Sequence, residues 1–301
     1  MTFFFLDKEH PRAEYFSARI TRRDTPAMPV PPDAPTILLH MHVTSISAFI
    51  ELVLRIRRAW YPNEIYPELW FRGMHDSTLD LLPGAYWRSP CDEGSMVVSF
   101  RSMVPPLLPR EPRDDWEWYF LMQHYGLPTR LLDWSENPLS ALYFALETVT
   151  GNRSPAVWIL DPLALNSLSG FDSVIVPFAG RWMDNWLPEE CGRGIPAKTF
   201  ERSDKKHNNA KPIAIFPKRH NPRIVAQRGT FTVHGTDEVP INHLQVNDTT
   251  TGAARIAQIV IDAASRDQLW ADLWALGVTK TSIYPEPQSV ADDLKRLYNV
   301  H

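Results

Sequence analysis

The chain has 301 residues and a formal net charge of −4, which argues against a strongly basic nucleic-acid-binding surface over its whole length. The two cysteines, Cys91 and Cys191, lie in polar surroundings and point to neither a disulfide framework nor a cysteine metal cluster. No apolar stretch is long enough for a signal peptide or a membrane span, so we expect a cytoplasmic protein with no membrane partner.

The N-terminal stretch, residues 1–40, includes a proline-rich run from Pro26 to Pro35. Prolines at this density favour stiff, extended backbone, so we predict an arm that packs weakly on the domain or wraps it. The elements of residues 41–301 share apolar faces and no clear linker separates them. We therefore predict that they form one domain.

The first predicted helix begins after Thr44 or Ser45, either of which is a suitable N-cap. Apolar residues then recur at helical spacing as far as Ile56. Residues 69–71 form a short apolar run typical of a strand, with Gly73 and polar residues behind it. This pattern places Arg72 at or near the end of a strand, close to a bend of the backbone.

A second helix is predicted from about Asp114 to Tyr125, because Gly126 is a natural C′ residue. A third begins at once, with Asn137 as its N-cap and Pro138 in the first helical position. The segment between the two helices, residues 129–135, is too apolar for an ordinary exposed loop.

Beyond residue 150 the pattern indicates strands, which we expect at residues 156–160, 213–216, 223–226, 230–233 and 256–261. Residues 166–210 are polar and rich in turns, so we expect an irregular insertion with short helices. A late helix ends at Gly277, residues 281–284 then extend, and a final helix runs from about Gln288 to Tyr298.

Several blocks of the sequence resemble the FRG domain family, which is named for its Phe-Arg-Gly triplet. The first block is Trp70–Gly73, and the central block is Gln123–Ser135 with its continuation Pro138–Ala145. Gln227–Phe231 is similar to the third block of the family. Residues 256–297 are similar to its C-terminal strand-helix-turn-helix pattern.

The resemblance covers about residues 44–297 and implies an FRG domain over 41–301. One departure is Ser135, where the family more often has threonine, although a hydroxyl is kept either way. Members of the family are mostly bacterial, and some are linked to mobile elements and anti-phage defence. The resemblance therefore suggests a bacterial toxin or a phage-defence role.

The order of these blocks is also similar to that of the ADP-ribosyltransferases of the arginine-serine-glutamate type. Phe71–Gly73 resembles their first strand, and Trp134–Ser135 with Ala141–Ala145 resembles their second strand and helix. Gln227 stands near the place of their catalytic glutamate. The resemblance implies an α+β fold with a split, mostly antiparallel central sheet and surrounding helices, and it implies NAD as the substrate.

By the same resemblance, the catalytic set is Arg72, Asp133, Ser135 and Gln227. Arg72 would bind the pyrophosphate or a ribose of NAD, and Ser135 would hold a ribose hydroxyl. A carboxylate has to stabilise the positive charge that develops on the ribose as nicotinamide leaves. Gln227 carries no such charge, so Asp133 or Glu136 would have to supply it, and without one we expect NAD binding with weak or no transfer.

Further residues are expected around the nucleotide. A glycine after the arginine allows a ligand to approach the backbone closely, and aromatic rings can stack on nicotinamide. The expected nucleotide-binding residues, in addition to Arg72, are Gly73, His124, Tyr125, Thr129, Trp134 and Tyr143.

Several polar side chains of this region also have a purely structural interpretation. Arg72 is as well suited to clamping Asp133 or a helix C-terminus as to binding a phosphate. Arg130 and Asp133 could satisfy each other as an internal ion pair. His124 more often caps a helix, where the dipole favours a protonated imidazole, and Gln227 is slightly more often a buried amide bonded to loop backbone.

An alternative function is a non-catalytic module that recognises a nucleic acid or a protein through the same pocket and a basic middle region. That region consists of Lys205, Lys206, Lys211, Lys218, Arg219, Arg223 and Arg228. A nuclease-like toxin that uses His124 and Asp133 is a third interpretation. The chain has no glycine-rich phosphate loop, nucleophile elbow or zinc-protease motif, and whether it is an enzyme stays open.

Overall fold

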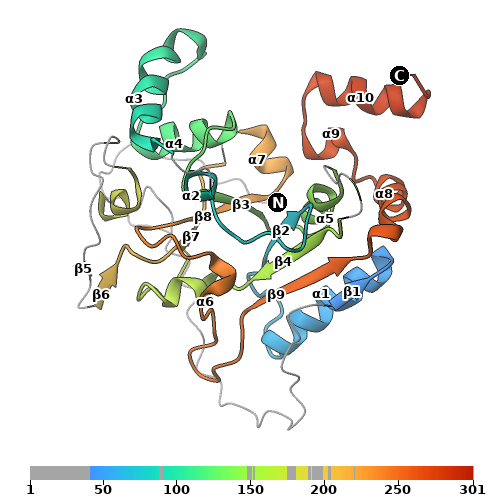
Figure 1. Ribbon diagram of the computed structural model, residues 1–301, viewed down its shortest axis with the longest axis horizontal. Coiled ribbons are helices and arrows are strands. Elements are labelled where there is room, and N and C mark those ends of the chain that lie inside the picture. Colours follow the sequence, from blue (N-terminus) through green and yellow to red (C-terminus); the bar gives the residue numbers. More distant parts are fainter. Residues whose placement is uncertain are drawn as a thin grey trace, which may run out of the picture.

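The computed structural model describes residues 41–87, 91–147, 151, 153–174, 181–188, 191, 199–202, 205–219 and 221–300. The predicted N-terminal arm, residues 1–40, lies outside this range and stays a prediction. The described elements form an α+β structure around one large sheet (Figure 1).

The central sheet has seven strands in the order β1-β9-β4-β2-β3-β8-β7. Its strands are β1 (Met41–Val43), β2 (Trp70–Met74), β3 (Leu131–Ser135), β4 (Ala156–Leu160), β7 (Ile213–Ile215), β8 (Gly229–Val233) and β9 (Ile256–Ile261). Only β1 and β9 pair in parallel, so the prediction of a mostly antiparallel sheet is confirmed. A separate hairpin pairs β5 (Thr199–Arg202) with β6 (Lys205–Asn208).

Helices cover this sheet and extend beyond it. The α-helices are α1 (Ile46–Trp60), α2 (Gly84–Trp87), α3 (Glu93–Met103), α4 (Asp115–His124), α5 (Pro138–Glu147), α6 (Pro162–Ser167), α7 (Pro222–Ala226), α8 (Arg266–Ala275), α9 (Lys280–Ile283) and α10 (Pro287–Leu297). Short 3-10 helices are η1 (Pro105–Leu107), η3 (Arg181–Trp186), η5 (Ile241–His243) and η6 (Ala263–Ser265). None of these described helices is long and apolar enough to span a membrane.

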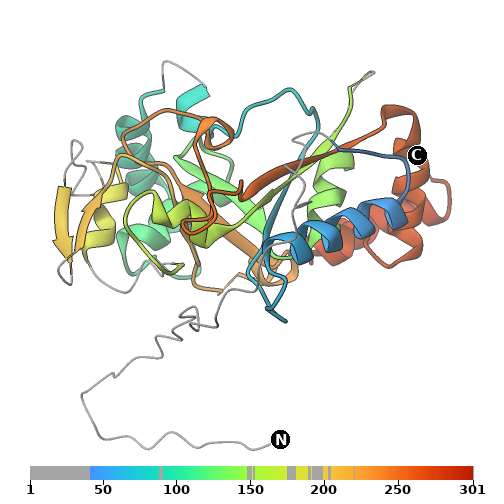
Figure 2. The same ribbon diagram turned by 90° about the horizontal axis from the view of Figure 1, so that it is seen from below.

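Two hydrophobic cores lie side by side on one face of the sheet. The first core joins α1, α5 and α8 to β2, β4 and β9, and Figure 2 shows α1 running beside α8. The second core joins α3, α4 and η3 to β3, β7 and β8. Directly paired strand residues share a face, and the pairing of Phe71 with Ser135 places both cores on the same side. A third core, with α6 and η5, covers the opposite face.

Among the neighbouring strands of the central sheet, β2 and β3 share the fewest paired residues. These strands pair at a single position, Phe71 with Ser135, whereas β3 and β8 pair along their whole lengths. The sheet is thus continuous, whereas the ADP-ribosyltransferase resemblance implies a sheet that is divided into two. The single pair between β2 and β3 is the junction between the part of the sheet under the first core and the part under the second.

The predicted helix ends are largely confirmed. Ser45 caps α1 through a hydrogen bond from the amide of Ala48, and Asn137 accepts one from the amide of Leu139 at the start of α5. Gly126 adopts the left-handed conformation after α4, with φ of 79°. Local capping chemistry therefore sets these boundaries.

Other expectations were wrong. Arg72 lies in the middle of β2, opposite Trp158 of β4, and not at a strand end. Residues 223–226 form the helix α7 and not a strand, because Asn221 caps it and Pro222 occupies its first turn. Residues 281–284 do not extend, since Thr279 starts the short helix α9 with a capping box.

Candidate functional site

A cleft of about 390 Å³ opens on the face that carries the first and second cores. Phe71 and Phe144 line it from the first core, and Phe120 and Phe231 line it from the second. The cleft therefore straddles the junction of β2 and β3. Its volume falls within the range of about 300–1,000 Å³ that is usual for small-molecule sites.

Three helices, α4, α5 and α7, and three strands, β2, β3 and β8, contribute to the lining, together with Tyr284, which follows α9. Figure 1 shows α4 and α7 above β3 and β8, with α5 and α9 on the side of β2. The polar and charged lining residues are Arg72, Gln123, His124, Asp133, Ser135, Arg223, Gln227, Thr230 and Tyr284. The proposed catalytic residues Arg72, Asp133, Ser135 and Gln227 thus border one cavity, although they come from distant parts of the chain.

The guanidinium of Arg72 bridges β2 and β3 beside their single backbone pair. One of its terminal nitrogens donates a hydrogen bond of 2.6 Å to the backbone carbonyl of Asp133, and the carboxylate of Asp133 lies 4.0 Å away. Its Nε is buried without a hydrogen-bond partner. Burial lowers the pKa of Arg72, and the Asp133 carboxylate opposes this shift. An arginine stays charged at neutral pH, so this cation is only partly compensated.

The carboxylate of Asp133 points toward solvent, and its side chain is 60% exposed. The amide of Gln123 donates a hydrogen bond of 2.7 Å to it, and the hydroxyl of Thr129 donates to the carbonyl oxygen of the same amide. Thr129 is buried and does not line the cleft, so it positions Gln123 and has no access to a ligand there. Sequence reasoning did not identify Gln123 as a partner of Asp133.

Arg130 does not pair with Asp133. Its Nε lies 2.8 Å from the carboxylate of Glu93 on α3, which also accepts a hydrogen bond from the hydroxyl of Tyr119. The backbone amide of Arg130 donates to the same hydroxyl. This network ties β3 to α3 and α4, so the ion pair expected between Arg130 and Asp133 is wrong.

The hydroxyl of Ser135 makes two internal hydrogen bonds. It donates to the backbone carbonyl of Gln227 over 2.6 Å and accepts from the backbone amide of Asn137 over 2.9 Å. A serine hydroxyl has one proton and two lone pairs, so only one acceptor position remains for a ligand. Ser135 thereby joins the end of β3 to the end of α7.

Gln227 follows α7 as its C-cap. Its side-chain amide donates a hydrogen bond of 3.2 Å to the backbone carbonyl of Ile283, so it bonds to backbone, as the structural interpretation expects. The amide oxygen of Gln227 carries no charge, and Asp133 is the sole carboxylate among the described residues that line the cleft. Glu136 instead pairs with Arg219 and Arg228.

His124 ends α4 and lines the cleft. Burial, and next the positive charge of Arg223, lower the pKa of His124 below its ordinary value. The imidazole is therefore neutral at pH 7, which differs from the protonated form expected from the helix dipole. A neutral imidazole can accept a proton from a bound molecule.

Gly73 lines the cleft and also has a packing role. A Cβ atom at this position would overlap the backbone carbonyl oxygen of Ala141 and come within 2.5 Å of the backbone nitrogen of Ala145. Gly73 therefore allows α5 to lie directly on β2. The close approach that this glycine permits is between two parts of the chain.

The predicted aromatic residues do not stack in the cleft. The indole of Trp134 is buried in the third core and donates to the hydroxyl of Thr232. Tyr143 packs against Trp270 in the first core, and Tyr125 is exposed beside Phe100. Trp134 nevertheless borders the cleft, together with the aromatic residues Phe71, Phe120, Phe144, Phe231 and Tyr284.

Arg223 and Tyr284 line the cleft, although neither is among the residues expected there. Arg223 of α7 lies over the ring of Tyr284, with 4.3 Å between the guanidinium carbon and the ring centroid. Tyr284 follows α9, and its hydroxyl donates to Glu147. The sequence places Arg223 and Tyr284 far apart, so no local signal could have paired them.

The basic middle region is largely neutralised by acidic neighbours. Lys211 pairs with Asp237, and Lys218 pairs with Asp114 and Glu117. The structure does not describe the side chains of Lys205 and Lys206. These ion pairs compensate much of the positive charge that favours a nucleic-acid-binding surface, which stays a prediction.

No group of His, Cys, Asp and Glu side chains suited to a metal ion occurs among the residues that the structure describes. The polar side chains that line the cleft carry guanidinium, carboxylate, imidazole, amide and hydroxyl groups.

Comparison with known protein families identifies an FRG domain, whose family model matches residues 67–153. The match contains β2, β3 and α5, and with them the Phe-Arg-Gly triplet and the central block. The blocks at residues 227–231 and 256–297 lie beyond it. No match was found among curated proteins or solved structures, so no relative supports the resemblance to ADP-ribosyltransferases.

Proposed function

We propose that the cleft binds NAD and that the protein is an ADP-ribosyltransferase-like effector with a toxin or phage-defence role. The observation that carries this proposal is the incompletely paired guanidinium of Arg72, which lines the cleft. Most of its N–H groups have no partner among the described residues, and a phosphate oxygen would supply one. Binding of a phosphate group would thus compensate the positive charge of Arg72, which burial shields from water.

Asp133 is the group in the cleft that can stabilise positive charge. When the bond between the ribose and nicotinamide breaks, its electron pair leaves with neutral nicotinamide, and the ribose becomes cationic. A carboxylate held by Gln123 and exposed to the cleft opposes that charge. The acceptor is a water molecule or an unidentified protein or nucleic acid.

The amide at Gln227 limits this chemistry. An amide can hydrogen-bond a ribose hydroxyl, but it cannot supply negative charge, and here it is directed to the carbonyl of Ile283. We therefore expect measurable NAD binding, with transfer or hydrolysis that is slow. NAD binding without any release of nicotinamide would favour the non-catalytic recognition module.

The proposal is tested by calorimetric titration of NAD, together with release of nicotinamide from labelled NAD in cell lysate. Because hydrogen bonds to charged groups contribute about 1.5–3 kcal/mol, we expect Arg72→Ala to weaken NAD binding by about 10- to 100-fold. Arg72→Lys keeps the charge but loses the planar guanidinium that can donate two parallel hydrogen bonds, so we expect an NAD affinity close to that of Arg72→Ala. Absence of NAD binding at millimolar concentration by the folded wild-type protein contradicts the proposal.

A further inference from the structure

Arg223 differs from the other basic residues around it. Lys211, Lys218, Arg219 and Arg228 each lie within ion-pair distance of a carboxylate. For Arg223, no carboxylate partner is found in the described part of the chain, and its guanidinium lies on the ring of Tyr284. Among the basic residues of this region whose side chains the structure describes, Arg223 alone lacks an acidic partner, and it is also the one that lines the cleft.

Tyr284 holds Arg223 in place for binding. A guanidinium stacked on an aromatic ring keeps its N–H groups in the plane of the stack, where they remain free to donate. The ring of Tyr284 is itself held, because its hydroxyl donates a hydrogen bond of 2.9 Å to Glu147 at the end of α5. The orientation of Arg223 is thus set by two elements that are distant in the sequence.

The charges of the cleft suit a ligand with two anionic groups. Arg72 and Arg223 contribute two positive charges, and Asp133 contributes one negative charge. The two cations come from different walls, β2 and α7, while the imidazole of His124 is neutral at pH 7. A single phosphate could be held by one guanidinium and would leave the other without an anion.

We propose that Arg223, stacked on Tyr284, is a second anion-binding group of the cleft, so that the ligand is a diphosphate ester. One phosphoryl group binds Arg72 and the other binds Arg223. This inference rests on the proposed binding of NAD, and it adds the way in which the two phosphoryl groups are held and a binding residue that the FRG motif does not contain.

The test is calorimetric titration of ADP-ribose and of AMP into the full chain, with the variants Arg223→Ala, Tyr284→Ala and Arg219→Ala. The last is the matched control, since it removes one positive charge that is paired with Glu136 outside the cleft. We expect Arg223→Ala and Tyr284→Ala to weaken ADP-ribose binding about tenfold or more, and AMP binding less than about threefold. Arg219→Ala should leave both affinities within about twofold of the wild type.

The outcomes separate this inference from the proposed function. Wild-type binding of ADP-ribose that Arg223→Ala leaves unchanged overturns the inference alone. Failure of the wild type to bind either ligand defeats the proposed function as well. Melting temperatures of the three variants report folding, and for any variant that unfolds, Arg223→Lys is titrated in its place and is expected to lose ADP-ribose affinity because it lacks the planar fork.

Discussion

At the scale of single residues, the Phe-Arg-Gly triplet has two roles: its first and third residues pack against other parts of the fold, and its arginine makes a polar contact. Phe71 is buried in the first core, and Gly73 lies against the backbone of α5. Arg72 between them reaches across to the carbonyl of Asp133. The flanking residues therefore hold β2 and α5 together, and this packing positions the guanidinium beside the cleft.

Replacing Gly73 by alanine should destabilise the fold severely. The added methyl group meets backbone atoms of Ala141 and Ala145, which cannot move without displacing α5 from β2. Overpacking of this kind costs about 3 kcal/mol or more in the free energy of unfolding, measured by denaturant titration. Gly277→Ala is the control, because its φ of 79° brings backbone strain alone and no atom lies within 4 Å. A cost at Gly73 no larger than at Gly277 would contradict the packing role.

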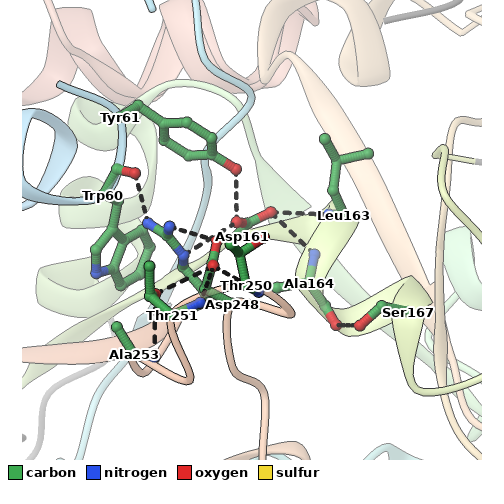
Figure 3. A network of polar contacts seen from close by, with 11 residues as sticks. Trp60, Tyr61, Asp161, Leu163, Ala164, Ser167, Asp248, Thr250, Thr251 and Ala253 are labelled. Carbon is green, nitrogen blue, oxygen red and sulfur yellow. Dashed lines mark hydrogen bonds and ion pairs between the residues drawn. The ribbon is translucent and has the colours of Figure 1, made fainter. Parts of the chain in front are cut away.

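At the scale of elements, a buried polar network joins parts of the chain that the sequence keeps far apart. Figure 3 shows Asp161 accepting from the hydroxyl of Tyr61 and from the first amides of α6. Arg255, just before β9, donates to the carboxylate of Asp248 over 2.6 Å and to the carbonyl of Trp60 over 2.6 Å. The end of α1, the start of α6 and the approach to β9 are thus held together.

Removing Arg255 should be costly, because it leaves the buried carboxylate of Asp248 without its cation. We expect Arg255→Met to lower the free energy of unfolding by about 3–5 kcal/mol. The control is Arg153→Met: the Arg153 side chain is 54% exposed, and its partner Asp76 keeps two hydrogen bonds from Thr78, so we expect a loss of about 1 kcal/mol or less. Equal losses in the two variants would show that the network adds little to stability. NAD affinity should stay unchanged in both, since neither arginine lines the cleft.

Helices whose ends are marked by capping residues could be predicted from the sequence. Strands and site residues that depend on contacts between distant parts of the chain could not. The pair Asn137-Pro138 correctly predicts the start of α5. The same pair at Asn221-Pro222 starts α7, although the apolar residues that follow it suggest a strand. The three residues of β1 become a strand only through pairing with β9. The motif likewise pointed to Arg72 and Asp133, but Arg223 and Tyr284 join the cleft only in the folded chain.

At the scale of the whole molecule, the cleft lies where two packed halves of the sheet meet. The first half contains β1, β9, β4 and β2 with the first core, and the second contains β3, β8 and β7 with the second core. One backbone pair and the Arg72 hydrogen bond join β2 to β3. A ligand held by Arg72 on one side and by Arg223 on the other would add a connection between the halves.

NAD should therefore slow hydrogen exchange on both sides of the junction, in β2 and in α7, and not on one side alone. At a ligand concentration of about 100 times Kd, binding contributes about 2.7 kcal/mol, which corresponds to a rise in melting temperature of roughly 5–10 °C for a domain of this size. Exchange measured by mass spectrometry with and without NAD gives the location of the effect, and Arg72→Ala at the same NAD concentration serves as the control. Protection restricted to the second half would mean that the ligand does not reach Arg72, because a bridging ligand has to restrain β2 as well as α7.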